Sequence, residues 1–200
     1  MNKWGLIVAK KEMTKIWIND EFVPVSILEV VPQEIVRYKN QEKDWYTAAL
    51  IWVWKKELDK EKGQKIKYKQ VTEFKVDDSF VSSHEAGKSL DIDLLEWVEK
   101  VNLTGESKWK GFQGMVKRYH IKWGWATHGH KFTRTWGSKW NRKPRRTLKW
   151  HPHAWHMWSA KITLKNLTIV ESVKNESGQL IILKGSVPGS LNSLLKLTIA

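Results

Sequence analysis

The chain has 200 residues, of which 41% are hydrophobic and 28% charged, a balance typical of a folded protein with one main domain. It contains no cysteine, which excludes disulfide scaffolds, thiolate metal sites and cysteine nucleophiles. The longest uninterrupted apolar run, residues 48–54, is far shorter than the roughly 20 residues that a membrane-spanning helix needs. We therefore expect a soluble cytoplasmic protein that does not enter a membrane.

The basic residues are distributed unevenly along the chain. Lys and Arg total 35 against 21 acidic residues, which gives a net charge of +14. Residues 107–170 contain fifteen Lys and Arg but no Asp or Glu, whereas the rest of the chain is close to neutral. Such a segment predicts a polyanionic partner, above all a nucleic acid, because clustered cations gain most from neutralising phosphates.

Short runs rich in Val and Ile, separated by turn-forming or charged residues, predict β-strands on both sides of the basic segment. In chain order they cover residues 5–9, 15–18, 22–31, 46–53, 71–76, 97–103, 162–169, 179–184 and 194–199. Pro24 indicates a sheet edge or a bulge, and the slip near Asn166 indicates another bulge. We expect a solvated loop over residues 59–70 and a turn over 175–178. No run of 12 or more residues has a convincing helical pattern, so we predict a mainly β protein, either a closed barrel or a sandwich.

The basic segment has no sustained period of 2 or 3.6 and scatters its apolar residues singly among Lys, Arg, His and Gly. Since it cannot form a core of its own, we expect it to be disordered alone and ordered by a polyanion. The predicted organisation is a β-barrel body, residues 1–104 and 161–200, with a basic RNA-binding extension, residues 105–160, inserted into it.

Six of the seven histidines lie in this extension and raise the alternative of a metal-binding or hydrolytic enzyme. They are His120, His128, His130, His151, His153 and His156. Ligating histidines usually need a carboxylate to orient them, and histidine bases usually need one as well. The extension offers only Glu106, at its start, and its many cations repel a divalent ion. We therefore interpret the histidines as hydrogen-bonding and stacking groups beside phosphates, and expect no metal, cofactor or catalytic residue.

Four separate groups of motifs resemble the universal ribosomal protein L three family of the large subunit. The segment Thr104–Gly114 is similar to the family's T-G-x-S-K-G-K-G-F-x-G sequence, and Val116–Tyr119, Ala126–Gly129 and Gly137-Ser138 resemble its continuation. Gly5–Ile7 with Lys11–Ile16 resembles the family's opening stretch, and Lys184–Gly189 its K-G-x-V-P-G turn. The resemblance thus covers nearly the whole chain, in order.

This resemblance implies a translation-protein-type β-barrel with an irregular extension that reaches through ribosomal RNA toward the peptidyl transferase centre and supports assembly. The implied partners are large-subunit ribosomal RNA and neighbouring ribosomal proteins, with the chain a monomer within the ribosome. By position, the extension would run from Gly105 to about Trp158. The candidate RNA-binding residues are Lys108, Lys110, Lys117, Arg118, Lys122, His128, Lys131, Arg134, Lys139, Arg142, Lys143, Arg145, Arg146, Lys149, His151 and His153.

The chain has 14 tryptophans, and about half stand where the resembled family has glycine. The clear cases are Trp45, Trp109, Trp123, Trp140, Trp150, Trp155 and Trp158; further cases are Trp4, Trp52, Trp54, Trp97, Trp125 and Trp136. They could stack on unpaired bases, or pack in the core, which suits Trp17 and Trp52. We favour a third hypothesis: the gene uses UGA as a glycine codon, and the amino-acid sequence was derived by reading UGA as tryptophan. It predicts that the clear cases in the extension are solvent-exposed, some at positive φ, while Trp17 is buried in the barrel.

Overall fold

The computed structural model describes residues 4–55, 68–135, 137–140, 142–175 and 178–200. Contacts divide the chain into two compact units. We call Met1–Ser107 with Lys161–Ala200 the barrel unit, and Lys108–Ala160 the basic unit. In the described part of the chain, none of the helices has the length and apolar composition required to span a membrane.

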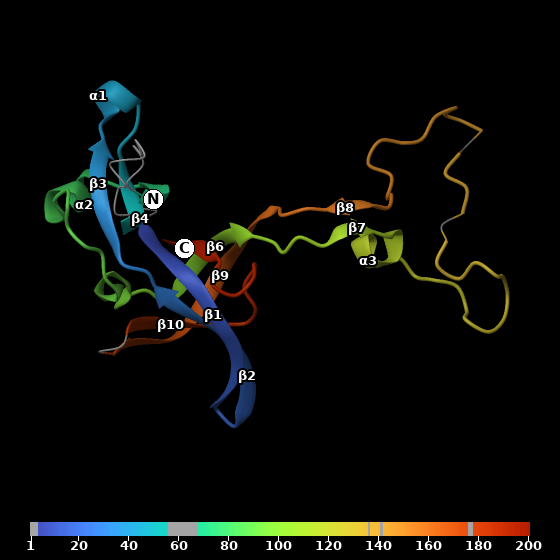
Figure 1. Cartoon of the computed structure of the whole chain (residues 1–200), viewed down its shortest axis with the longest axis horizontal. Coiled ribbons are helices and arrows are strands. Elements are labelled where there is room, and N and C mark those ends of the chain that lie inside the picture. The colour runs from blue at the N-terminus through green and yellow to red at the C-terminus, as the bar shows by residue number, and fades with distance from the viewer. Residues whose placement is uncertain (1–3, 56–67, 136, 141, 176–177) are drawn as a thin grey trace, which may run out of the picture. The chain divides into compact units, whose positions relative to one another are not determined.

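Six antiparallel strands close the barrel (Figure 1), which confirms the prediction of a mainly β protein. Their order around the barrel is β1-β11-β6-β9-β10-β2. The strands are β1 (Gly5–Ile18), β2 (Glu21–Val30), β6 (Lys100–Glu106), β9 (Lys161–Asn175), β10 (Gly178–Lys184) and β11 (Leu194–Ile199). The last pair of β6 and β9 joins Glu106 to Lys161, so both ends of the basic unit leave from neighbouring strands.

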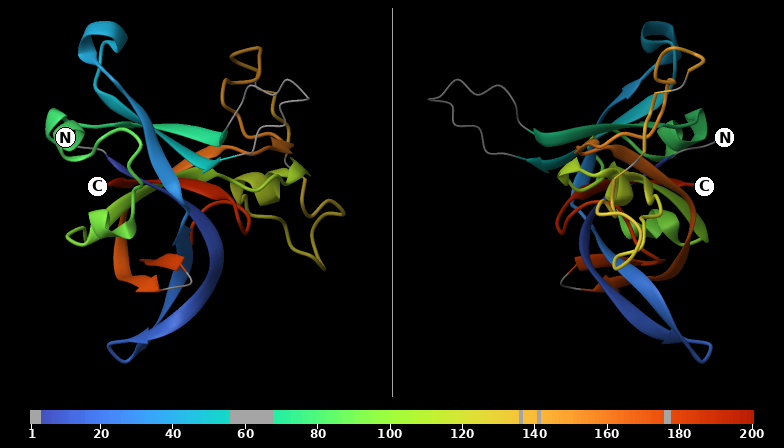
Figure 2. Two further views of the ribbon diagram at one scale, coloured as in Figure 1. Left: turned by 60° about the vertical axis from the view of Figure 1, so that its left-hand side comes forward. Right: turned by 90° about the vertical axis from the view of Figure 1, so that its right-hand side faces the viewer.

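Among the described residues, the barrel unit also contains a second sheet and three short helices (Figure 2). The sheet has the order β3-β4-β5, with β3 (Gln33–Lys39), β4 (Ala48–Lys55) and β5 (Tyr68–Lys75). The helices are α1 (Gln41–Asp44), α2 (Asp78–Ser83) and the 3-10 helix η2 (Ile92–Leu95). The prediction omitted β3, and it gave residues 68–70 to a loop although they belong to β5. The rest of that predicted loop, residues 59–67, lies outside the described residues.

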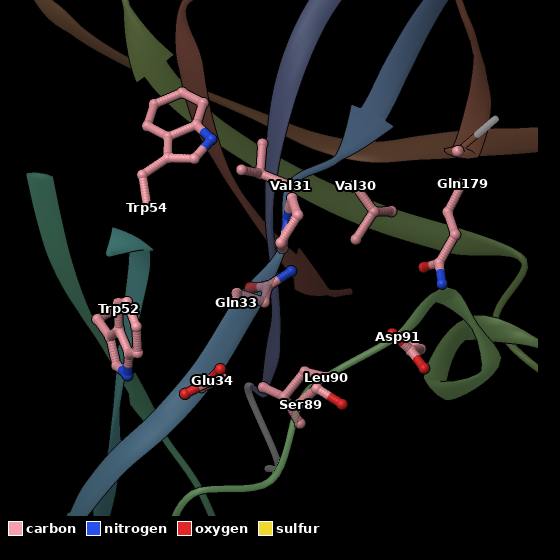
Figure 3. A pocket seen from close by; sticks show the side chains of 12 residues that line it. Val30, Val31, Gln33, Glu34, Trp52, Trp54, Ser89, Leu90, Asp91 and Gln179 are labelled. Atoms are coloured by element: carbon pink, nitrogen blue, oxygen red, sulfur yellow. The ribbon is translucent and has the colours of Figure 1, made fainter. Parts of the chain in front are cut away.

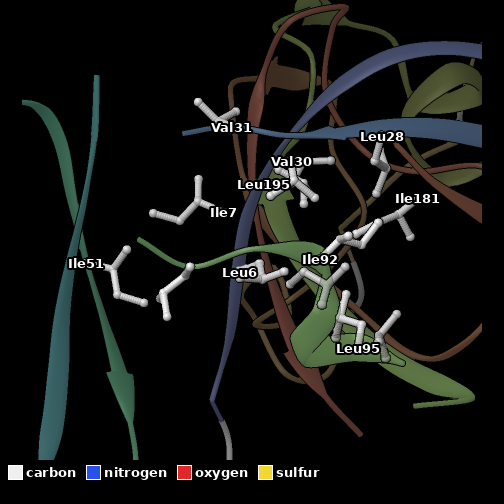
Figure 4. Close-up of a cluster of buried hydrophobic side chains, with 14 of the residues drawn as sticks. Leu6, Ile7, Leu28, Val30, Val31, Ile51, Ile92, Leu95, Ile181 and Leu195 are labelled. Carbon is white, nitrogen blue, oxygen red and sulfur yellow. The ribbon is translucent and has the colours of Figure 1, made fainter. Parts of the chain in front are cut away.

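One cluster of buried side chains joins the barrel to the three-stranded sheet (Figure 4). Ile51 of β4 and Ile7 of β1 both belong to it, and both side chains are almost fully buried. Residues 5–10 of β1 are buried at every position, so this half of the strand is covered on both faces. That burial explains why residues 5–9 are continuously apolar instead of alternating with polar residues.

The Gly185–Gly189 turn closes over a buried lysine. Lys10 is only 5% exposed, and its Nζ donates to the carbonyl oxygens of Val187, at 2.8 Å, and Gly189, at 3.2 Å. Gly185 and Gly189 have φ values of 93° and 89°, a region that favours glycine. The Lys184–Gly189 motif therefore forms a turn whose carbonyl groups help to solvate the Lys10 ammonium group.

Both predicted irregularities of the strands are confirmed. Pro24 pairs with Lys15 of β1 at the point where the pairing of β2 with β10 ends at Val25, and its carbonyl oxygen accepts from Gly185 N at 2.8 Å. The register of β6 and β9 shifts next to Asn166, which has a φ of 56°. Asn175 and Gly178 pair across the end of the β9–β10 hairpin, while residues 176–177 of the predicted turn lie outside the described part of the chain.

The prediction that Trp17 is buried in the barrel is wrong. Residues 5–9 and 15–18 belong to a single strand, β1, and beyond Glu12 it pairs only with β2. Residues 15–24 thus form a two-stranded hairpin that continues past the barrel, as both views of Figure 2 show. Trp17 lies there and is 59% exposed, whereas Trp52 of β4 is buried as expected of a core residue.

The described part of the basic unit contains three short elements. Strands β7 (Gly111–Gln113) and β8 (Trp155–Met157) pair antiparallel, and helix α3 (Met115–Tyr119) follows β7. Between α3 and β8, the described residues form no helix or strand. The sequence did not predict these elements, since three to five residues are too few to show a period.

Candidate nucleic-acid interface

The sixteen candidate RNA-binding residues all lie in the basic unit, and most of their side chains are open to solvent. The exposed ones are Lys108, Lys110, Lys117, Lys122, His128, Lys131, Arg134, Arg142, Lys143, Arg145, Arg146 and Lys149. The remaining four, Arg118, Lys139, His151 and His153, are half-buried. The unit therefore presents a dense set of accessible cations and a smaller, more enclosed group.

The half-buried group forms one cluster around His153. The Arg118 guanidinium donates to the carbonyl oxygen of His153 at 2.8 Å, and Lys139 Nζ lies 2.7 Å from His153 Nδ1. The rings of His151 and His153 are 5.7 Å apart. We call Arg118, Lys139, His151 and His153 the His153 cluster. Its hydrogen bonds place two permanent cations beside two imidazoles, an arrangement suited to an anion.

The pKa of His153 is lowered below its ordinary value. Partial desolvation of the ring is the largest cause, followed by the positive charges of Lys139, His151 and Arg118. The lowered pKa favours the neutral ring, whose Nδ1 can accept the hydrogen bond that the Lys139 amine donates. A bound phosphate would oppose these effects, because an anion stabilises the imidazolium form.

Replacing Lys139 with methionine is expected to raise the pKa of His153 toward its ordinary value. The substitution removes a neighbouring positive charge and the hydrogen bond that favours the neutral ring. An NMR titration of the His153 ring protons measures the change, with the exposed Lys149→Met as the control. An equal or lower His153 pKa in Lys139→Met would contradict the cluster geometry.

A second group of side chains lines a pocket between α3 and the following segment. Lys110, Lys117 and Arg134 contribute charge, while Gln113, Val116, His120, Trp123 and Met157 complete the wall. The Arg134 guanidinium lies 4.9 Å from the Trp123 ring centre. His120 and Trp123 were not among the candidate residues. Only their proximity to basic residues in the sequence could have indicated them.

Aromatic rings gather along the paired strands β7 and β8. His156 stacks on Trp158 with ring centres 5.3 Å apart, and it meets Phe112 edge to face at 5.4 Å. Trp109 lies 6.2 Å from Trp158. Phe112, Trp109 and Trp158 each keep more than half of their surface exposed, so flat surfaces remain for an unpaired base.

The six tryptophans expected to be exposed are all exposed, which confirms that prediction. They are Trp109, Trp123, Trp140, Trp150, Trp155 and Trp158. Of these six, Trp150 alone has positive φ, at 66°. Trp136, named as a further case, lies outside the described residues.

Nothing in the described part of the basic unit forms a metal centre. Groups of three or more His, Asp or Glu side chains that could hold an ion do not occur among the described residues of the whole chain. Residues 108–160 contain no Asp or Glu that could orient a histidine. The described partners of His153 are the cations Arg118 and Lys139, which repel a divalent ion.

A different pocket lies within the barrel unit (Figure 3) and has the wrong charge for a polyanion. Val31, Trp52, Trp54 and Leu90 line it together with eight further residues, of which Glu34 and Asp91 are the only charged ones. Because a nucleic acid would meet carboxylates there, we place the candidate interface on the basic unit.

Comparison with known proteins identifies the family. No family model matches the chain. A protein of Oceanobacillus iheyensis named large ribosomal subunit protein uL3 is 34% identical over 206 residues, covering 98% of this chain and 97% of that protein. Proteins of the same name from Deinococcus radiodurans, at 34% over 198 residues, and Haemophilus influenzae, at 32% over 200 residues, match 93% and 94% of their own lengths. The chain therefore belongs to the uL3 family of large ribosomal subunit proteins.

Proposed function

We propose that this protein is a structural, non-enzymatic constituent of the large ribosomal subunit and that its basic unit binds ribosomal RNA. The observation that carries the proposal is a 53-residue unit, Lys108–Ala160, that holds no carboxylate and exposes most of its cations. The relatives are named for the large subunit, which gives this unit a polyanionic partner of the right kind.

The exposed Lys and Arg side chains would neutralise phosphates and supply the sequence-independent part of the affinity. The His153 cluster would bind a phosphate between Arg118 and Lys139, where both side chains are already held by hydrogen bonds. The exposed ring of Phe112 would stack on an unpaired base. In this arrangement the barrel unit is a folded platform, and residues 105–160 form the extension that reaches into RNA toward the peptidyl transferase centre.

Co-sedimentation tests the proposal directly. The native protein should remain in the large-subunit fraction of a density gradient after washes at high salt, because a unit threaded into RNA neutralises many phosphates at once. Recovery in the ribosome-free fraction at low salt would refute the proposal.

Replacing both Arg145 and Arg146 with alanine is expected to weaken binding to ribosomal RNA almost equally for different RNA sequences. The slope of log affinity against log salt should fall by about 0.7–0.9 for each phosphate that is no longer neutralised. Filter binding over a salt series measures this slope. The double variant Lys43→Ala/Lys88→Ala removes the same charge from exposed sites of the barrel unit and should leave the slope unchanged. An unchanged slope in the arginine variant would show that these side chains do not touch phosphate.

A further inference from the structure

The hairpin of β1 and β2 carries a row of exposed aromatic and apolar side chains on one face. On this face, Trp17 pairs with Phe22 across the strands, Lys15 pairs with Pro24, and Met13 continues the row. We call these five residues the hairpin face. All five side chains are exposed, and Phe22, like Trp17, keeps about 60% of its surface open to solvent.

The hairpin face is ordered by its own contacts. The Trp17 and Phe22 rings meet edge to face with centres 4.6 Å apart, and Lys15 Nζ lies 4.5 Å from the Phe22 ring centre. The opposite side of the hairpin, with Ile16, Ile18 and Val23, is half-buried, so the aromatic side is the one left in water. Contiguous exposed aromatic and Met side chains are typical of protein–protein interfaces.

The charges around the hairpin face favour a protein over RNA. Asp20 is exposed in the turn beside it, and Glu12 and Glu21 are exposed on the opposite side of the hairpin. These three carboxylates outnumber Lys15, the cation of the hairpin face, while Lys11 lies 2.7 Å from the carboxylate of Glu29. These carboxylates would repel phosphates, in contrast to the carboxylate-free basic unit. They complement a polypeptide rich in Arg and Lys, whose guanidinium groups also stack on aromatic rings.

We propose that the hairpin face docks a basic segment of a neighbouring protein of the large subunit. Aliphatic or guanidinium groups of that segment cover Trp17 and Phe22, and its cations meet Glu12, Asp20 and Glu21. The inference rests on the proposed function, since it needs the protein to reside in the subunit. It assigns the barrel unit a partner of its own, separate from the RNA that the basic unit binds.

Site-specific photo-crosslinking in purified large subunits tests this docking. A photoreactive benzophenone amino acid replaces Met13, and the matched control places it at Leu191, an exposed apolar position in a turn of the barrel unit. We expect Met13 to crosslink to one Lys- and Arg-rich peptide of another protein, identified by mass spectrometry. The double substitution Trp17→Ser/Phe22→Ser should lower that yield about tenfold or more, since buried aromatic anchors dominate interfaces, while Leu191 crosslinks stay unchanged.

Each outcome separates this inference from the proposed function. If the protein is absent from large subunits, the proposed function fails. If it is present but Met13 crosslinks to RNA, to an acidic peptide or to nothing, the hairpin inference alone is overturned. Trp17→Phe preserves an aromatic surface and should keep the crosslink, so it remains a usable comparison if the double variant is poorly incorporated.

An independent observation concerns the backbone at other tryptophans. Eight described non-glycine residues have positive φ, and five of them are Asn, Asp or His, the types that tolerate it best. The other three are Trp45, Trp54 and Trp150, with φ of 68°, 52° and 66°. Trp45 ends α1 in the left-handed conformation, the position where helices favour glycine. Trp45 and Trp150 are also at least 90% exposed, so no packing holds either ring there.

We infer that the native polypeptide carries glycine at Trp45, Trp54 and Trp150, and at the exposed tryptophans of the basic unit, through UGA codons read as glycine. Glycine removes the strain at positive φ and lets the backbone approach RNA closely. Trp17 is different, because it lies in a regular antiparallel pair with Phe22 and packs against that ring. We infer that Trp17 is a true tryptophan, encoded by UGG.

Peptide mass spectrometry of the native protein, read beside the gene, decides this second inference. We expect glycine and a UGA codon at positions 45, 54, 109, 150 and 155, and tryptophan with a UGG codon at position 17. Tryptophan at 45 and 150 would overturn it. In the recombinant chain, Trp45→Gly should raise the midpoint of thermal unfolding, whereas Trp17→Gly, made in a regular strand, should not.

Discussion

Deletion of residues 123–155 is expected to remove most of the affinity for ribosomal RNA while the barrel unfolds as before. The deleted segment holds eight Lys and Arg, including Arg145 and Arg146, and part of the His153 cluster. Because every neutralised phosphate releases counterions, removing this many cations should lower the affinity by on the order of a thousandfold at moderate salt. The strands of the barrel all lie outside the deletion, so the packing of their core stays intact.

Two measurements check this expectation. Filter binding at several salt concentrations gives the affinity, and thermal unfolding followed by circular dichroism gives the stability of the barrel. Loss of cooperative unfolding in the deletion variant would contradict the division into two units. Retention of full RNA affinity would contradict the assignment of the interface to the basic unit.

Gly5→Ala is expected to cause the largest loss of stability among single glycine substitutions in the barrel. A Cβ at Gly5 would lie 1.8 Å from the carbonyl oxygen of Leu197 and 2.8 Å from Thr198 Cα, so β1 and β11 would have to separate. Leu6, Ile7 and Val8 follow directly and are fully buried, which prevents the strand end from detaching at little cost. We expect a loss of about 3 kcal/mol in the free energy of unfolding, at the upper end for overpacked cores.

Urea denaturation measures this loss. Gly137→Ala is the matched control, because a Cβ there would meet nothing within 4 Å and the residue does not have positive φ. Equal stability of the Gly5 and Gly137 variants would mean that β1 and β11 are paired more loosely than their register implies.

Local sequence predicted most barrel strands, because their Val and Ile runs are long enough to stand out between turns. It missed β3, whose buried residues include Gln33 as well as Ile35. The Gln33 side chain accepts a hydrogen bond from Ile7 N at 2.9 Å and donates one to Ile7 O at 3.3 Å. In the sequence, a glutamine that is buried in this way looks the same as one on the surface. Trp17 was misplaced for the converse reason, since an aromatic in a strand normally indicates the core.

The sequence predicted which segment forms the candidate interface, but not which of its side chains come together. A stretch without carboxylates identifies the basic unit by composition alone. The His153 cluster, however, joins Arg118 to a residue 35 positions later, and the pairing of β7 with β8 brings the flanking segments together. Two three-residue strands carry no recognisable pattern, so no local signal could show which cations meet.

The closure of the barrel has a consequence for how the chain is made. Its first strand, β1, pairs with its last, β11, through Gly5–Thr198 and Ala9–Leu194. Translation releases β1 first, but its partner β11 emerges only after all the residues between the two strands have been synthesised. The apolar residues 5–9 must therefore wait, shielded by β2 alone or by a chaperone, and a nascent chain that stalls before residue 194 leaves them open to aggregation.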